Sequence, residues 1–225
     1  MLAAGIGVRH GRGWAVRAAS FRIGPPEPGR SALGILVEDP AQSAVLVDLL
    51  AGVARPAYGE LRVLGHDMAT IRGRAAVRRR VGVARRAART LPWLTVRGMV
   101  QHAARIARPD RQDRPLLAAA ILDRLALLPW ADVQMRAAPD AIARRARLAA
   151  AAVHQPELLL LDGLLDGLAT REVRTLADAI RHLSRDSGVL LAGCDGAALE
   201  LASDDILVLA DGVLINSWQG ASLSP

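Results

Sequence analysis

The sequence predicts an α/β fold with a mixed sheet core, an antiparallel β part and an all-helical insert. Short apolar runs alternate with helical stretches rich in Ala, Leu and Arg, which is typical of parallel strands joined by helical crossovers. The strand signal disappears between Val96 and about His154, and it returns at Glu157. With 225 residues, the chain has the length of one domain that carries a subdomain.

The strands are predicted from short apolar runs that turn residues or charges interrupt. In chain order they cover residues 6–9, 15–21, 33–37, 60–64, 81–84, 157–161, 189–192, 205–209 and 213–216. Asp211 and Gly212 separate the last two runs, and Asp-Gly between apolar runs is a strong hairpin signal. We therefore expect the last two strands to pair antiparallel.

The helical insert is predicted over residues 96–154. Helical periodicity covers residues 97–106, 114–128 and 140–154, with prolines between the three stretches. The remaining segments, 1–95 and 155–225, are predicted to form the sheet core, so that residues 1–225 make a single domain.

The composition excludes several kinds of chemistry. All 29 basic residues are arginines, against 22 acidic residues, which gives a formal net charge of +7. The absence of lysine excludes Schiff-base chemistry and a phosphate-loop lysine. The single cysteine, Cys194, excludes an internal disulfide and a cysteine-rich zinc site. Five histidines without metal-ligand spacing predict no metal site, and no G-x-S-x-G elbow follows a strand.

The apolar runs and the aromatic content bear on location and partners. The first residues lack the apolar stretch of a secretory signal, and charges interrupt every apolar run before the roughly 18 residues that a membrane span requires. We expect a cytoplasmic protein. Aromatic residues make up only 3% of the chain, so a stacking surface for single-stranded nucleic acid is not expected.

Five segments follow one another in an order that indicates a family. They read LAGVARPAYGELRVLGHD from Leu50, VRRRVGVA from Val77, LPWLTVRGMV from Leu91, HQPELLLLD from His154 and DDILVLADGVLI from Asp204. In these segments the chain resembles the ATP-binding subunits of ABC transporters, particularly those of two-component drug and antibiotic exporters. The resemblance covers nearly the whole chain and implies an ABC cassette with a P-loop NTPase-like core.

The phosphate-binding loop of that family, G-x-x-x-x-G-K-S/T, falls on residues 37–45 but does not match. Glycines are needed there because the loop takes φ > 0 and brings successive N–H groups onto the phosphates. Here Val37 and Pro40 replace two of them, and Pro40 has no N–H to donate. Ser43 stands in place of the lysine, and Ala44 in place of the hydroxyl that ligates Mg²⁺. The resemblance assigns to nucleotide binding the positions Val37, Pro40, Gln42, Ser43, Ala44, Val45, Arg86, Asp162, Gly163 and Cys194.

The other motif positions are also altered, each identified by its place in the resemblance. Asp162 keeps the Walker B aspartate, but Gly163 stands where the family has its catalytic glutamate. Cys194 stands at the switch histidine and Arg86 at the glutamine that senses the phosphate. We expect Cys194 to be a small buried side chain rather than a nucleophile. The signature-loop positions are Ala138, Pro139, Asp140, Ala141 and Ile142, and Asp140 is expected to cap the following helix while repelling a phosphate.

With these substitutions we expect no catalytic residues and no cofactor. The resemblance then implies a degenerate ABC subunit, a pseudo-ATPase that is a non-hydrolysing structural or regulatory partner of a membrane permease or exporter. Two alternatives stay open: an active ATP-hydrolysing exporter subunit with atypical motifs that uses Mg-ATP, and a free-standing Arg-rich protein that binds nucleic acid or another anion. Nucleotide held in an altered pose, with Arg86 supplying the missing positive charge, also stays open.

The expected partners follow from the same resemblance. Trp93, Leu94 and Thr95 fall on the segment that receives the permease, although Trp93 also fits a core position of the helical insert. A second cassette subunit, identical or different, is expected as dimer partner at the inner face of the cell membrane. Nine arginines between Arg72 and Arg97 fit either anionic lipid headgroups or an ordinary solvated face, and nucleic acid is the less expected ligand.

Overall fold

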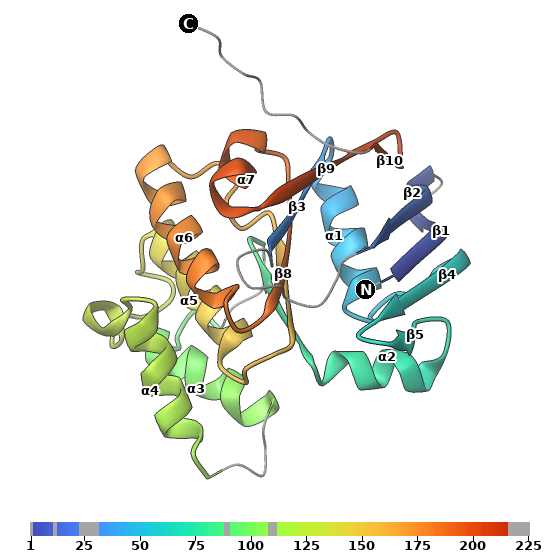
Figure 1. Ribbon diagram of the computed structural model, residues 1–225. Helices are drawn as coiled ribbons and strands as arrows, with labels where there is room; N and C mark the ends of the chain where they lie inside the picture. The colour runs from blue at the N-terminus through green and yellow to red at the C-terminus, as the bar shows by residue number, and fades with distance from the viewer. Residues whose placement is uncertain (1, 11–12, 23–31, 88–90, 108–111, 216–225) are drawn as a thin grey trace, which may run out of the picture.

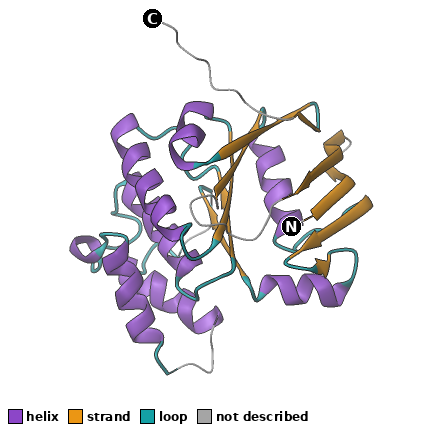
Figure 2. Cartoon of the chain, viewed as in Figure 1, coloured by secondary structure: helices purple, strands orange, loops and turns teal. Residues whose placement is uncertain are grey.

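The computed structural model describes residues 2–10, 13–22, 32–87, 91–107 and 112–215. A four-stranded antiparallel sheet and a six-stranded mixed sheet lie on either side of helix α1, and most other helices cover the far face of the mixed sheet (Figure 1). Figure 2 shows this division: most helices gather on one side, while α1 and α2 lie on the side of the antiparallel strands. The predicted fold class is confirmed.

The antiparallel sheet has the strand order β2-β1-β4-β5. Its strands are β1 (Leu2–His10), β2 (Gly13–Arg22), β4 (Tyr58–Val63) and β5 (His66–Asp67). The sequence analysis missed β5, because two residues are too few to form an apolar run. A tight turn at Leu64 and Gly65, both with positive φ, folds β5 back onto β4.

The mixed sheet has the strand order β10-β9-β3-β8-β7-β6. Its strands are β3 (Ala32–Val37), β6 (Val81–Arg85), β7 (Leu158–Asp162), β8 (Gly188–Gly193), β9 (Asp205–Ala210) and β10 (Val213–Ile215). All neighbouring pairs are parallel except β9 and β10, whose hairpin is confirmed. Asp211 and Gly212 both have positive φ there, as a two-residue hairpin turn requires. Residue 216, the predicted end of the last strand, lies outside the described residues.

The helices connect these strands and fill the insert. They are α1 (Pro40–Leu50), α2 (Ile71–Arg78), α3 (Val96–Ala107), α4 (Arg114–Arg124), α5 (Asp140–Ala152), α6 (Thr170–Leu183), α7 (Gly196–Ala202) and the 3₁₀ helix η1 (Leu128–Trp130). The predicted helix over residues 114–128 is too long: α4 ends at Arg124, Ala126 takes a positive φ, and the separate 3₁₀ helix η1 begins at Leu128. Within the described residues, no helix has the length and apolar character to cross a bilayer.

The central strands β7 and β8 of the mixed sheet are buried on both faces. Along β7, Leu158 and Leu160 face the core that α1 and the antiparallel sheet cover, while Leu159 and Leu161 face the core beneath the helices. Because successive side chains of a strand point to opposite faces, only a continuous apolar run satisfies both cores. The run ends at Asp162, which places a carboxylate at the edge of the sheet.

Candidate functional site

The candidate site lies at the carboxyl edge of four neighbouring parallel strands, β3, β8, β7 and β6. Asp162 at the end of β7 is in register with Ala192 of β8 and with Arg85 of β6, and Leu36 of β3 is in register with Gly193 of β8. The segments that follow these strands therefore meet at one edge. Ligands of open α/β sheets bind at such an edge, next to the strand ends.

The loop between β3 and α1 uses its own groups to satisfy the first turn of the helix. Asp39 is the N-cap, and its carboxylate accepts a hydrogen bond from the Ala41 N–H at 2.8 Å. The Gln42 N–H donates to the Asp39 carbonyl at 2.9 Å, and Pro40 has no N–H. None of residues 37–45 has a positive φ. This segment is an ordinary capped helix start rather than a concave nest of free N–H groups.

Ser43, in the first turn of α1, is buried and hydrogen-bonded to Asp162 at the end of β7. Its hydroxyl donates to Asp162 Oδ1 at 2.5 Å. The second carboxylate oxygen of Asp162 lies 3.6 Å from Nη1 of Arg85, and Nη2 of Arg85 donates to Asp48 Oδ1 at 2.5 Å. Four side chains from α1, β6 and β7 thus form one polar network, in which a single guanidinium faces two carboxylates.

Burial sets the proton affinity of Asp162. The pKa of this carboxyl is raised above its ordinary value mainly because the group is removed from water, and the nearby Asp48 and Asp166 carboxylates raise it further. The Ser43 hydroxyl and the Arg85 guanidinium act in the opposite direction. These two neighbours therefore stabilise the ionised form of the carboxyl.

The turn between β7 and α6 contains a glycine in a left-handed conformation and a buried carboxylate. Gly163 has φ of +60°, a left-handed conformation that side-chain-bearing residues rarely adopt. Asp166 is buried, and its Oδ1 accepts hydrogen bonds from the N–H groups of Cys194 at 3.1 Å and Asp195 at 3.3 Å. A side chain at Gly193 would meet this carboxylate oxygen. The Asp166 carboxylate thus links the turn after β7 to the backbone of Cys194 and Asp195.

Cys194 is exposed, so the expectation of a small buried side chain is wrong. The reason is local: β8 ends at Gly193, and the chain turns outward before α7 begins. Desolvation, followed by the carboxylates of Asp166, Asp39 and Asp162, raises the pKa of the thiol above its ordinary value. A thiol in this state is a poor nucleophile at neutral pH.

The signature-loop positions 138–142 begin α5, where a buried arginine organises them. Arg144 is only 2% exposed and donates to the carbonyls of Leu164 at 3.1 Å and Asp166 at 2.7 Å. Its Nη2 and Nε also donate to Asp140 Oδ2, at 2.6 and 2.9 Å. The expectation that Asp140 caps α5 is wrong, because Pro139 is the N-cap residue and the Asp140 carboxylate binds Arg144 instead. This ion pair lowers the pKa of Asp140.

A role of Arg86 in supplying charge to a bound nucleotide stays a prediction. The side chain of Arg86 is exposed and lies along the turn at Gly163 and Gly167. The arginine that reaches Asp162 is Arg85, one residue earlier, and sequence reasoning missed it. The signal was present in the strand register, since the last residue of a strand next to β7 points along the same edge as Asp162.

The three positions expected to contact a permease lie in different surroundings. Trp93 is 63% exposed, so the alternative of a core tryptophan is wrong. Leu94 packs against the core beneath the helices, and the Thr95 hydroxyl accepts a hydrogen bond from the Gly98 N–H at the start of α3. Trp93 is the member of the group that offers a large apolar surface to another molecule.

Most arginines of the Arg72–Arg97 stretch hold the fold together. Five of the nine donate to groups of the chain itself: Arg74 to two carbonyls, Arg78 to the Gly52 carbonyl, Arg80 to Glu157 and Leu64, Arg85 to Asp48, and Arg97 to Asp132. Arg89 lies outside the described residues. The stretch is therefore not a continuous patch of free guanidinium groups.

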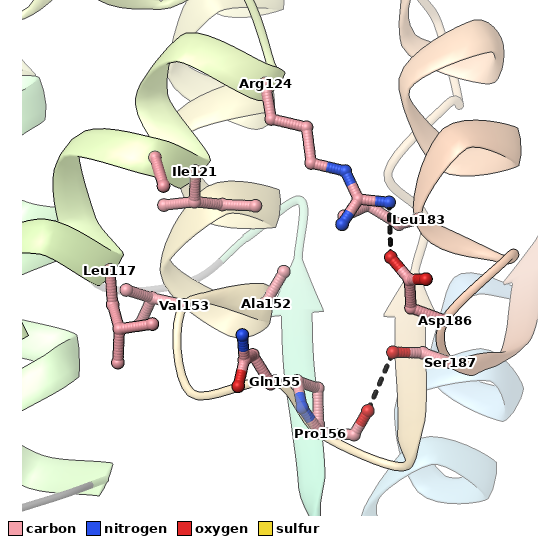
Figure 3. Close-up of a pocket in the computed structure, with 11 residues that line it drawn as sticks. Leu117, Ile121, Arg124, Ala152, Val153, Gln155, Pro156, Leu183, Asp186 and Ser187 are labelled. Atoms are coloured by element: carbon pink, nitrogen blue, oxygen red, sulfur yellow. Dashed lines mark hydrogen bonds and ion pairs between the residues drawn. The ribbon is translucent and has the colours of Figure 1, made fainter.

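A cavity lies near the beginning of β7 and β8, at the end of these strands opposite to Asp162 (Figure 3). It encloses about 200 Å³ between α4, α6 and the segment before β7, and apolar side chains such as Ile121 and Leu183 line it. Beside it, the guanidinium of Arg124 pairs with Asp186 at 2.6 Å, and the Ser187 hydroxyl donates to the Pro156 carbonyl. No cluster of three potential metal ligands occurs in the part of the chain that the structure describes.

Mg-ATP, the ligand that the family resemblance implies for the sheet edge, does not fit the residues present. The N–H groups of Ala41 and Gln42 are already bonded, and Ser43 is turned toward Asp162. Asp39 adds a negative charge where a polyphosphate would lie. No step of a hydrolysis reaction can be derived from this arrangement.

Comparison with known proteins identifies the relatives of the chain. The sequence profile described as "ABC transporter" matches residues 43–165. The methionine import ATP-binding protein MetN 2 of Burkholderia mallei is 26% identical over 188 residues, which cover 82% of this chain and 48% of that protein. The aliphatic sulfonates import ATP-binding protein SsuB 2 of Paracoccus denitrificans is 33% identical over 159 residues, or 68% of this chain and 62% of that protein.

Solved structures agree with the fold. The dimeric structure of MJ0796, a bacterial ABC transporter cassette, superposes with a TM-score of 0.82 at 14% identity and covers 97% of this chain and 99% of that chain. The chain spans about half the length of the methionine-import relative that it matches. The relatives named here are import proteins, so the exporter subtype stays a prediction.

Proposed function

Because the chain belongs to the ABC transporter family as an ATP-binding cassette, we propose that it is a degenerate cassette subunit that does not hydrolyse ATP. In this proposal the chain is a structural or regulatory partner of a membrane permease, and it lies at the inner face of the membrane that holds the permease. Neither a catalytic residue nor a nucleotide cofactor is assigned to it.

The observation that carries the proposal is the hydrogen bond from Ser43 to Asp162. A cassette that hydrolyses ATP needs a positive charge and a metal ligand at these two positions, together with a general base. Here the two side chains satisfy each other, and the next residue is Gly163. Loss of a single preorganised stabilising group typically costs roughly 3 to 4 kcal/mol of transition-state stabilisation. Several such groups are replaced at once in this chain.

Trp93 supports the permease part of the proposal. A side chain with 63% of its surface exposed is unusual for tryptophan, which is mostly buried when it has no partner. Tryptophan is also enriched among the residues that dominate binding energy at protein interfaces. We assign Trp93 as the anchor of the permease contact, with Leu94 and Thr95 holding its backbone in place.

A second cassette subunit is the other proposed partner. The MJ0796 cassette, which has the same fold, was solved as a dimer. In this chain both the phosphate-loop positions and the signature-loop positions bind groups of the chain itself. The proposal covers a dimer of two identical chains and a mixed dimer with a different cassette. In a mixed dimer, the partner's phosphate loop would face signature-loop positions that are already bonded within this chain.

Phosphate release by the purified chain with millimolar Mg-ATP tests the proposal. We expect no release above the rate without protein, while a cassette with intact phosphate-loop and glutamate residues, assayed in parallel, turns over ATP. Sustained turnover that co-elutes with the chain would establish the active ATPase alternative instead.

Binding to a candidate permease tests the docking part. Trp93→Ala is expected to reduce capture of the detergent-solubilised permease at least tenfold, as loss of a dominant anchor of about 2 kcal/mol would. Leu116→Ala is the matched control, because Leu116 is 73% exposed and lies on α4. Equal capture by both variants would remove Trp93 from the interface.

A further inference from the structure

The polar network at the sheet edge combines oxygen atoms of the kind that bind a metal ion with a positively charged side chain, the guanidinium of Arg85. Asp162 is 13% exposed and Asp48 37%, and both carboxylates point at the guanidinium of Arg85. The buried Ser43 hydroxyl completes the set of oxygens. Carboxylate and hydroxyl oxygens that converge in this way are the ligands that Mg²⁺ prefers in proteins.

The network joins three elements of the chain. Ser43 and Asp48 come from α1, Asp162 from β7 and Arg85 from β6. A buried carboxylate without a positive partner is costly, and burial already raises the pKa of Asp162. The position of Arg85 is fixed by the parallel register of β6 and β7, which sets its Cα opposite that of Asp162.

We propose that Arg85 is a built-in counter-ion that takes the place of a divalent cation at Asp162. Its guanidinium links β6 to α1 and β7, so this edge is held together without a bound ligand. One positive charge faces two carboxylates, and Glu38 and Asp39 lie on the loop above. The negative charge of the edge therefore disfavours a polyphosphate. A metal ion is disfavoured because the guanidinium of Arg85 already lies between the carboxylates.

The inference deepens the proposed function and rests on it for the identity of the edge, but it makes a separate claim. The proposed function says that the chain does not hydrolyse ATP. The claim about Arg85 says which side chain has replaced the metal, and it predicts that removing this side chain creates a response to Mg²⁺.

The test is thermal unfolding of the full chain and three variants, with and without 10 mM MgCl₂ (about ten millimolar being enough to fill a weak two-carboxylate site). The variants are Arg85→Ala, Asp162→Asn and the double variant. Arg85→Ala is expected to lower Tm on the order of 5 °C, because a charge-assisted hydrogen bond and an ion pair are lost. In the Asp162→Asn variant, Arg85→Ala is expected to lower Tm by less than half as much as in the wild-type chain.

Magnesium distinguishes a counter-ion from a side chain that only packs. We expect 10 mM MgCl₂ to restore roughly half of the Tm lost in Arg85→Ala, and to leave the wild-type chain and the double variant unchanged. Arg72→Ala is the matched control: Arg72 is exposed on α2, and its removal is expected to leave both Tm and the magnesium response at the wild-type value.

Three results would overturn the inference: a wild-type chain that Mg²⁺ stabilises, equal costs of Arg85→Ala in both backgrounds, or no magnesium response in Arg85→Ala. If Arg85→Ala does not fold, Arg85→Lys replaces it, and this variant is expected to lose less Tm and to stay insensitive to Mg²⁺ because it keeps one positive charge. ATP turnover by the wild-type chain would contradict the proposed function but not the claim about Arg85. Equal costs of Arg85→Ala with and without Asp162→Asn would contradict the claim about Arg85 but not the proposed function.

Discussion

At the scale of single residues, the sheet edge is defined by one backbone conformation and one side-chain hydrogen bond. Gly163 takes a left-handed conformation, and the Ser43 hydroxyl donates to Asp162. The proposed function assigns these positions to the family's catalytic glutamate and phosphate-loop lysine. On that proposal, restoring one family residue is expected not to restore the site, because the neighbouring backbone and contacts differ as well.

Gly163→Glu is the most direct case. We expect this variant to lose about 1 to 2 kcal/mol of unfolding free energy, since a residue with a side chain is strained at φ of +60°. An added Cβ would also lie 3.2 Å from Asp166 Oδ2. The predicted fall in Tm is roughly 2 to 8 °C, measured by thermal unfolding, with no ATP turnover gained.

Gly65→Ala controls for the backbone term. Gly65 has φ of +81°, and an added Cβ there meets nothing within 4 Å. It should therefore cost less than Gly163→Glu. A Gly163→Glu protein that is as stable as the wild type would show that the turn is not fixed in the conformation described.

At the scale of secondary-structure elements, arginine side chains link segments that are distant in the chain. Arg144 joins the start of α5 to the turn after β7, and Arg80 joins the segment before β6 to the segment before β7 through Glu157. In a chain without lysine, the planar five-donor guanidinium suits such multiple contacts.

Arg144→Met tests the first link. The variant keeps the apolar stem but leaves the buried carbonyls of Leu164 and Asp166 without their donor. We expect a loss of about 3 kcal/mol, which corresponds to a fall in Tm of roughly 6 to 12 °C. Arg174→Met, at an exposed position of α6, is the control and should change Tm little. Similar Tm values for the two variants would contradict the role of Arg144.

The Arg80–Glu157 pair predicts a pH dependence. The hydrogen bond from Arg80 lowers the pKa of Glu157 below its ordinary value, so the folded state binds this proton less readily than the unfolded state. The stabilisation is therefore present above the ordinary glutamate pKa and is lost as the pH falls through the lowered one. Both side chains are more than a third exposed, which makes the effect small and sensitive to salt.

Glu157→Gln provides the measurement. The Tm difference between wild type and variant should be largest near pH 7 in low salt and should shrink as the pH falls below about 4. It should also shrink in 0.5 M NaCl, about where screening becomes strong. A difference that is independent of both pH and salt would show that the pair does not contribute through its charges.

The elements could be predicted from the sequence largely because the chain has a strong local signal. The continuous apolar run of β7 and the Asp-Gly turn before β10 each specify their structure without help from distant residues. The two-residue β5 and the early end of α4 depend on tertiary contacts and on single backbone conformations, such as that of Ala126, which no periodicity encodes. The site was predicted by position, but its contacts were not: Arg85 and Arg144 are recognisable only when strand register and helix packing are known.

At the scale of the whole molecule, the chain has the fold of an ABC cassette. At the carboxyl edge of its mixed sheet, the polar side chains form hydrogen bonds and ion pairs with one another. Both hydrophobic cores are formed, and Trp93 is exposed, as the proposed docking role requires. The central claim is that the chain keeps the shape of a cassette without the need for nucleotide.

Thermal unfolding of the pure chain with and without millimolar Mg-ATP tests that claim most directly. A ligand at about 100 times its dissociation constant adds roughly 2.7 kcal/mol, which for a chain of this size raises Tm by roughly 5 to 10 °C. We predict no change in Tm. A rise of several degrees with Mg-ATP, absent with MgCl₂ alone, would show that the loop over residues 37–45 binds nucleotide and would contradict the account.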